Sequence, residues 1–203
     1  MTYTANRTTG TPGAPLFLTF HGTGGTEHQF HDFARSLIPD VHVISPRGDV
    51  SEGGALRYFR RNAEGIYDMP DLARRTAAMA DFIAAEKASA KAARVIALGY
   101  SNGANILASV AFQRPDLVDD LILLHPLIPF TPAPQPGLAG RRVLITAGRR
   151  DPICPAPLTQ TLADWFIAQG AKVTLHWHNG GHEIDQSEVV AIKTFLTGSF
   201  ILA

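Results

Sequence analysis

The chain has 203 residues, a length that predicts a single compact domain. Hydrophobic residues make up 45% of it and charged residues 18%, which excludes a disordered or collagen-like chain. Its 18 Lys and Arg residues balance 18 Asp and Glu residues, so the composition favours neither nucleic acid nor an anionic membrane as a partner. A single cysteine excludes an internal disulfide and is compatible with a reducing compartment.

The first fifteen residues are rich in Thr, Gly and Pro. They predict an N-terminal extension, residues 1–15, ahead of one domain over residues 16–203. The first apolar run, Leu16-Phe17-Leu18, is too short for a signal peptide or a membrane span. We therefore expect a cytoplasmic protein with no membrane insertion.

Six short apolar runs predict β-strands. Most are continuously apolar, which is typical of parallel strands covered on both faces. In the last run, apolar residues alternate with Thr174 and His176, which predicts a strand near the edge of the sheet with one wetter face. The predicted strands are Leu16–Phe20, Val41–Ile44, Val95–Tyr100, Leu121–His125, Arg142–Ala147 and Val173–Trp177.

Five segments carry apolar residues at helical spacing. The second follows Asp68 and has Pro70 in its first turn, and Gly170 is positioned to end the fourth. Alternation of strands and helices predicts an α/β fold, a mostly parallel twisted sheet with helices on both faces, whose functional residues gather at the carboxyl ends of the strands. The predicted helices are Glu27–Leu37, Pro70–Ala90, Asn102–Gln113, Pro157–Gln169 and Glu183–Leu196.

The third predicted strand runs directly into Gly99-Tyr100-Ser101-Asn102-Gly103, and a helix follows. This is the pattern G-x-S-x-G in the context of strand, sharp turn and helix that exposes a nucleophilic serine. The flanking glycines remove Cβ atoms from a crowded turn, and the helix N-terminus favours a developing anion. An ordinary turn is the alternative, but the strand before and the helix after favour Ser101 as a nucleophile.

A serine hydroxyl needs a histidine base that is held by a carboxylate. Asp151 follows the fifth predicted strand, and His182 lies in the glycine-rich loop after the sixth. Taken alone, each has a plainer interpretation, Asp151 as a turn or cap residue and His182 as a solvated loop residue. Their order after Ser101, each beyond a different strand, predicts a Ser-Asp-His catalytic triad.

The first strand ends in His21-Gly22-Thr23-Gly24-Gly25, a loop with little side-chain bulk. Such a loop can direct backbone N–H groups at an oxyanion, and two donors are needed. We predict these to be the N–H groups of Thr23 and Asn102. The alternatives are a generic turn or a phosphate cradle, but the G-x-x-x-x-G-K-[ST] pattern of a nucleotide-binding loop is missing.

Together with Gly148-Arg149-Arg150-Asp151-Pro152 and Gly181-His182-Glu183, these motifs resemble the phospholipase/carboxylesterase branch of the α/β-hydrolases. The segment from Pro46 to Asp68 is similar to a bacterial subgroup of small esterases, and the resemblance spans the chain from about Leu16 to its end. It implies an α/β-hydrolase fold with no separate cap domain and a rather open site.

The resemblance also implies a serine carboxylesterase that cleaves esters of small or medium acyl or aromatic substrates through an acyl-enzyme, with the triad Ser101, Asp151 and His182. No metal or organic cofactor is required. The same triad serves a lysophospholipase or a thioesterase, and the fold also serves non-catalytic ligand-binding relatives. A dienelactone-hydrolase-type enzyme is expected to carry Cys at position 101, where this chain has Ser.

Two loops are expected to shape the pocket. The segment Ser51–Asp68 contributes Tyr58 and Phe59, and the segment Pro126–Gly137 contributes Leu127, Ile128 and Phe130. These side chains either line the substrate pocket or pin the loops to the body of the protein. Arg60 and Arg61 either attract an anionic substrate group or form surface ion pairs.

Other polar residues carry weaker signals. The pairs His28/His31 and His176/His178 have no Cys partner and no H-E-x-x-H helix, so we predict no metal site. Cys154 lies close to Asp151 in the sequence, but no second base is evident and we interpret it as a spare small residue. A homodimer is compatible with the sequence, although no long exposed apolar run demands one.

Overall fold

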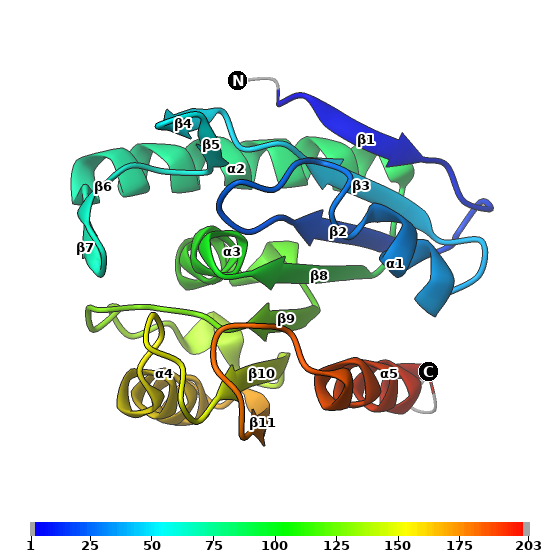
Figure 1. Cartoon of the computed structure of the whole chain (residues 1–203). Coiled ribbons are helices and arrows are strands. Elements are labelled where there is room, and N and C mark those ends of the chain that lie inside the picture. The colour runs from blue at the N-terminus through cyan, green and yellow to red at the C-terminus, as the bar shows by residue number, and fades with distance from the viewer. Residues whose placement is uncertain (1–2, 201–203) are drawn as a thin grey trace.

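The computed structural model describes residues 3–200, and seven strands of this part form one sheet (Figure 1). All neighbouring pairs are parallel except β1 and β3, which are antiparallel. The carboxyl ends of the six parallel strands therefore meet at one edge, and β11 lies at the side of the sheet, as predicted. In spatial order the strands are β1 (Ala5–Thr8), β3 (His42–Pro46), β2 (Leu16–Phe20), β8 (Val95–Tyr100), β9 (Asp120–Leu124), β10 (Arg142–Gly148) and β11 (Lys172–His178).

Helices cover both faces of the sheet, which confirms the predicted fold class (Figure 1). Helices α2, α3 and α4 pack on one face, whereas α1 and α5 pack on the other. Across the described residues, none of the helices has the length and apolarity that crossing a membrane requires. The helices are α1 (His31–Leu37), α2 (Met69–Ala90), α3 (Asn102–Gln113), α4 (Ala156–Ala168) and α5 (Gln186–Phe200), with 3-10 turns η1 (Pro115–Leu117) and η2 (Pro136–Leu138).

The two faces of the sheet have separate hydrophobic cores. Along β2, Leu16 and Leu18 belong to the core under α2, α3 and α4, and Phe17 between them belongs to the core under α1 and α5. Strand β8 alternates in the same way, with Ala97 on the first side and Ile96 on the second. The strands are continuously apolar because successive side chains enter different cores.

Strand β1 lies within the segment that the sequence predicts as an extension. It pairs with β3 along four residues, from Ala5 opposite Pro46 to Thr8 opposite Val43. Its sequence, Ala-Asn-Arg-Thr, has no apolar run, so only the backbone ladder to β3 makes it a strand. Residues 1–2 of the predicted extension and residues 201–203 of the predicted domain lie outside the described part.

Helices α1 and α5 begin later than their apolar patterns indicate. Residues 27–30 form turns, in which the Gln29 side chain accepts the N–H of Gly22 at 2.8 Å. Ahead of α5, the Asp185 carboxylate accepts the N–H of Ser187 at 2.8 Å and satisfies one of the free donors of the first turn. The residues before α1 therefore contact the loop after β2, and those before α5 cap the first turn of that helix.

Two small hairpins lie between β3 and α2, in the segment that is expected to be a loop. Strand β4 (Val50–Glu52) pairs with β5 (Ala55–Arg57), and β6 (Arg61–Ala63) pairs with β7 (Ile66–Tyr67), both antiparallel. The hairpins are too short to have a core of their own. They carry side chains into the cavity described below.

Candidate active site

Ser101 occupies a sharp turn between β8 and α3, with φ 52° and ψ −117°. A residue other than glycine is uncommon at positive φ, and the surrounding contacts must hold it there. Its N–H donates to the carbonyl of Leu124 at 2.9 Å. A Cβ on Gly99 would lie 2.5 Å from the carbonyl oxygen of Gly103, and a Cβ on Gly103 would lie 2.4 Å from that of Phe20. The turn therefore requires both glycines of the G-x-S-x-G pattern.

The structure brings together the side chains of Ser101, His182 and Asp151. The Ser101 Oγ lies 3.0 Å from His182 Nε2, and His182 Nδ1 lies 2.8 Å from Asp151 Oδ2. Register explains the second contact, because the last residue of β10, Gly148, pairs with the last residue of β11, His178. With Nδ1–H donating to the carboxylate, Nε2 is free to accept the serine proton.

The Asp151 side chain is fully buried, and four donors surround it. Its Oδ1 accepts the backbone N–H groups of Ile153 and Cys154 at 2.8 and 2.9 Å. Its Oδ2 contacts His182 and, at 2.9 Å, His125. Burial raises the pKa of this carboxyl, but the hydrogen bonds from Cys154, His125, His182 and Ile153 outweigh burial and lower it. Asp151 is therefore ionised at neutral pH.

Tyr100 supports the loop that carries His182. Its hydroxyl donates to the carbonyl of His182 at 2.7 Å, and the two rings are tilted with their centroids 5.4 Å apart. Burial is the main cause that raises the pKa of Tyr100 to about 12, so its hydroxyl remains a donor. The imidazole is thus held from its backbone and its face as well as through Asp151.

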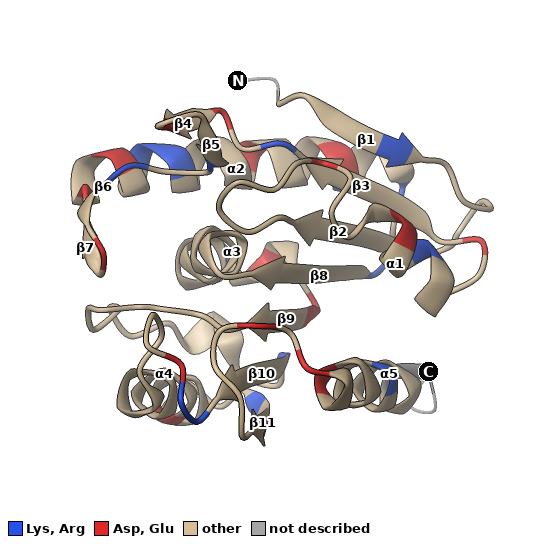
Figure 2. Cartoon of the chain, viewed as in Figure 1, with Lys and Arg blue, Asp and Glu red and all other residues tan. Residues whose placement is uncertain are grey.

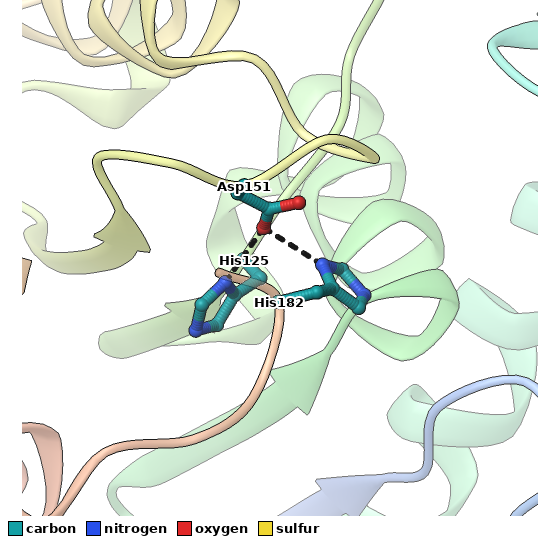
Figure 3. Close-up of side chains that lie close together, drawn as sticks. All are labelled: His125, Asp151 and His182. Carbon is teal, nitrogen blue, oxygen red and sulfur yellow. Dashed lines mark hydrogen bonds and ion pairs between the residues drawn. The ribbon is translucent and has the colours of Figure 1, made fainter. Parts of the chain in front are cut away.

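A second histidine, His125, contacts the same carboxylate from the other side (Figure 3). It follows β9 with φ 49°, and its side chain is fully buried. Its Nδ1 lies 2.9 Å from Asp151 Oδ2, and its Nε2 lies 3.2 Å from Oε1 of Glu188, a fully buried residue of α5. The Glu188 carboxylate also accepts the hydroxyl of Thr146 at 2.5 Å and the N–H of Asp185 at 2.6 Å.

His125 and Glu188 are not among the site residues predicted from the sequence, although each carries a signal there. His125 ends an apolar run at the carboxyl edge, and Tyr100 pairs with Leu124, so Ser101 and His125 follow neighbouring strand ends. Glu188 lies on the apolar face of α5, four residues before the buried Ile192. A carboxylate on an apolar face needs a buried partner, which here is His125.

In the loop after β2, residues 21–25, one backbone N–H group lacks an acceptor in the described part of the chain. Four of its five N–H groups have acceptors within the chain, and in residues 3–200 the N–H of Thr23 has none. The N–H of Asn102, the first residue of α3, also lacks an acceptor there. Both residues line one cavity with Ser101. The satisfied N–H groups are those of His21 (Tyr58 Oη, 3.1 Å), Gly22 (Gln29 Oε1, 2.8 Å), Gly24 (Leu56 O, 3.0 Å) and Gly25 (Gly22 O, 3.0 Å).

The cavity beside Ser101 has a volume of about 270 Å³. Of the five side chains considered for the pocket, Leu127 lies on its wall. Tyr58, Phe59 and Ile128 are buried in the core, and Phe130 lines a separate cavity beside α2 and α3. The other lining residues are Thr23, Arg57, Arg61, Glu64, Tyr67, Tyr100, Ser101, Asn102, Asn105, Ile153, Cys154 and His182.

Tyr58 and Phe59 point into the body of the protein because polar and aromatic contacts hold them there. The Tyr58 hydroxyl donates to the carbonyl of Pro46 at 2.8 Å and accepts the N–H of His21. Phe59 packs edge-on against Tyr67, with ring centroids 4.8 Å apart. These contacts match the alternative in which the aromatic residues pin the loop.

Charged side chains form one wall of the cavity. Arg57 is nearly fully buried, donates to Thr23 Oγ1 at 2.9 Å and pairs with Glu52 at 3.3 Å. Arg61 pairs with Glu52 and Glu64. Figure 2 shows both signs of charge in this region, around α2 and the β6–β7 hairpin. Arg60 is exposed, and its backbone N–H donates to Asp71. Of the two arginines considered for an anionic group, only Arg61 lines the cavity.

Two groups of side chains have the composition of a metal site. His125 belongs to both, once with Asp151 and His182 and once with His178 and Glu188. In each group a ring nitrogen of His125 lies within hydrogen-bond distance of a carboxylate, so both of its nitrogens are engaged without a metal. Cys154 also lines the cavity, and burial raises the pKa of its thiol, which donates to the carbonyl of His125 at 3.2 Å. A thiol in that state is not a nucleophile.

This sheet order and site define an α/β-hydrolase. The sequence profile of the dienelactone hydrolase family matches residues 57–184, and the chain belongs to this family. The matched residues include Ser101, where a Cys is expected of a dienelactone-hydrolase-type enzyme. That expectation applies to one type of enzyme and does not decide membership of the family.

Relatives agree with this assignment. The chain is 42% identical over 175 residues to MhqD of Bacillus subtilis (strain 168), a candidate hydrolase by its name, and the match covers 85% of this chain and 88% of that protein. A carboxylesterase structure from Bacillus cereus is 37% identical with a TM-score of 0.88, covering 95% and 92% of the two chains. Atu2452 from Agrobacterium tumefaciens str. C58, a protein of unknown function, is 53% identical with a TM-score of 0.91, covering 97% and 96%. The chain is therefore a hydrolase with carboxylesterase-like relatives.

Proposed function

We propose that this protein is a serine carboxylesterase that acts on esters of small or medium acyl or aromatic substrates. The observation that carries the proposal is the contact chain from Ser101 Oγ to His182 Nε2 at 3.0 Å and from His182 Nδ1 to Asp151 Oδ2 at 2.8 Å. It begins at the wall of a cavity that can admit an ester. The Bacillus cereus relative, a carboxylesterase, supports the same reaction class.

In the first half of the reaction, the Ser101 oxygen attacks the ester carbonyl carbon while His182 Nε2 takes the hydroxyl proton. Asp151 fixes the imidazole tautomer and stabilises the imidazolium. The carbonyl oxygen becomes an oxyanion, which accepts the free N–H groups of Thr23 and Asn102. His182 then gives its proton to the leaving alkoxide, and the acyl group stays on Ser101.

In the second half, a water molecule attacks the carbonyl carbon of the acyl-enzyme, and His182 takes a proton from that water. Collapse of the second tetrahedral intermediate returns the proton to the Ser101 oxygen and releases the carboxylic acid. Every step uses side chains and backbone groups of the chain itself. The proposal therefore requires no metal or organic cofactor.

The cavity supports short substrates over long ones. Its volume of about 270 Å³ lies below the range of roughly 300–1,000 Å³ usual for sites that enclose a drug-sized ligand. Leu127, Ile153 and Tyr67 offer apolar surface for an acyl or aromatic group, and Arg57 and Arg61 form a charged part of the same lining.

The test is hydrolysis of p-nitrophenyl esters of increasing chain length by the wild type and by Ser101→Ala. We expect the highest kcat/KM for short acyl chains and a loss in kcat of roughly 10⁴-fold or more in the variant, which retains only binding and oxyanion stabilisation. Undiminished esterase activity in S101A contradicts the mechanism. A preference for long-chain or thioester substrates in the wild type contradicts the substrate class.

A further inference from the structure

His125 is a fully buried imidazole that the proposed reaction leaves without a role. Its two ring nitrogens lie 2.9 Å from Asp151 Oδ2 and 3.2 Å from Glu188 Oε1 (Figure 3 shows the first contact). A ring nitrogen at this distance from an ionised carboxylate must carry the proton, because a carboxylate oxygen only accepts. If both carboxylates are ionised, His125 is an imidazolium.

The donors around each carboxylate indicate that both are ionised. Asp151 Oδ1 receives two backbone N–H groups, and the Glu188 oxygens receive the Thr146 hydroxyl and the N–H of Asp185. A protonated carboxyl group would turn an O–H donor toward these N–H and O–H donors, and no acceptor would be left for them. Burial opposes the charge on His125, but the hydrogen bonds to Glu188 and Asp151 outweigh it and raise the pKa of the imidazole.

Other titratable groups also face His125, and none of them takes the place of its contacts with Asp151 and Glu188. His178, from β11, accepts the N–H of Gly180 on Nδ1 at 3.1 Å, and its Nε2 lies 3.5 Å from Glu188 Oε2. Tyr100, from β8, has its pKa raised to about 12, and burial raises the pKa of the Cys154 thiol. Two groups on the loop after β11 remain: His182, whose ring centroid lies 5.2 Å from that of His125, and the exposed Glu183, whose carboxylate interacts electrostatically with His125.

We propose that His125 is a positioning residue of the triad: bonded to Glu188 on one side, it holds the Asp151 oxygen that binds His182 and places a positive charge beside the His182 ring. The proposal rests on the proposed hydrolase function of the same site. His125 does not touch the reacting atoms and acts only through Asp151.

Geometry links the two imidazoles directly. Both donate to Asp151 Oδ2, and their ring centroids are 5.2 Å apart. A positive charge on His125 therefore opposes a second positive charge on His182. The backbone also holds His125 at positive φ, where its N–H donates to the carbonyl of Thr146 at 2.8 Å. Such a conformation persists only where its surroundings enforce it.

The experiment compares His125→Asn with Thr146→Val through the pH dependence of kcat/KM for p-nitrophenyl acetate. Asn keeps a donor for Asp151 but removes the cation, so we expect the acid-side midpoint to rise by about one pH unit. Val matches the volume of Thr and disturbs the same cluster without changing a charge, so the midpoint stays at the wild-type value. Equal midpoints in H125N and wild type would overturn the proposal and leave His125 a structural role.

A second measurement uses the wild type and does not depend on a folded H125N. In protein labelled with ¹⁵N-histidine, we expect one histidine to keep two protonated ring nitrogens above pH 6.5, the ordinary pKa of the side chain, with its signals displaced in T146V. Absence of such an imidazolium overturns the proposal. These outcomes differ from failure of the proposed function, in which wild-type protein hydrolyses no ester whatever the state of His125.

Discussion

Two groups of charged side chains flank Ser101, the proposed nucleophile, and they differ in their exposure to water. The buried network of His182, Asp151, His125 and Glu188 has carboxylates that are 0% exposed. The rim pairs of Arg61 with Glu52 and Glu64 have carboxylate side chains that are 45% and 55% exposed. Both groups alternate acids and bases, yet only the first holds its charges away from solvent.

This difference decides what each group can do. Water and salt screen charges at the rim, so an ion pair there contributes roughly 0–1 kcal/mol. In the buried network the same charges interact strongly, and loss of one partner leaves another charge unpaired. In the mechanism that we propose, the network therefore affects both proton transfer and stability, whereas the rim is open to a substrate.

The largest expected effect comes from breaking the network at its centre. Asp151→Asn keeps the size of the side chain but removes the charge that both histidines share, and it disfavours the required tautomer of His182. We expect kcat for p-nitrophenyl acetate to fall about 10⁴-fold. A fall of less than tenfold, in protein whose circular dichroism matches the wild type, contradicts the role of Asp151.

A matched pair of variants compares the stability contributions of the two groups. Glu188→Gln leaves the His125 cation with one carboxylate fewer and should lower the free energy of unfolding by about 3 kcal/mol. Glu64→Gln makes the same chemical change at the rim and should lower it by less than about 1 kcal/mol. Urea denaturation measures both, and equal losses would refute the distinction between network and rim.

The smallest effect is the pH dependence of wild-type stability. The lowered pKa values of Asp151 and Glu188 stabilise the fold above their ordinary values of 3.8 and 4.5, and this contribution is lost as pH falls through the folded-state values. The raised pKa of His125 stabilises the fold fully below 6.5 and ceases to do so as pH rises through the folded-state value.

The contribution of Asp151, Glu188 and His125 to the free energy of unfolding should therefore be largest between about pH 5 and 6.5 and decline on both sides. Denaturation of wild type at pH 3, 6 and 9 measures the two declines. In His125→Asn the alkaline decline should be smaller, because the group that loses its proton is gone. An unchanged alkaline decline in that variant contradicts the assignment.

The sequence predicts the features that depend on local pattern. The predicted bounds are confirmed for the strands Leu16–Phe20 and Val95–Tyr100 and for the helix Asn102–Gln113. Apolar runs and the turn residues beside them specify these bounds locally. The loops that carry Asp151 and His182 begin where predicted strands end, so their approach follows from a parallel sheet.

Features that depend on distant pairing could not be predicted in this way. Strand β1 exists through its ladder to β3, and Tyr58 turns inward to reach Pro46. His125 and Glu188 are 63 positions apart and meet only because α5 packs on the sheet, against β10 and β11. Their residue types signal an unusual burial, but only the three-dimensional structure identifies the partner.

The most direct test of the catalytic triad is covalent labelling of the intact protein with a fluorophosphonate, followed by peptide mapping by mass spectrometry. We expect one adduct per chain, on the peptide that contains Ser101, and no adduct in Ser101→Ala. Labelling elsewhere, or labelling that persists in the variant, would contradict this expectation.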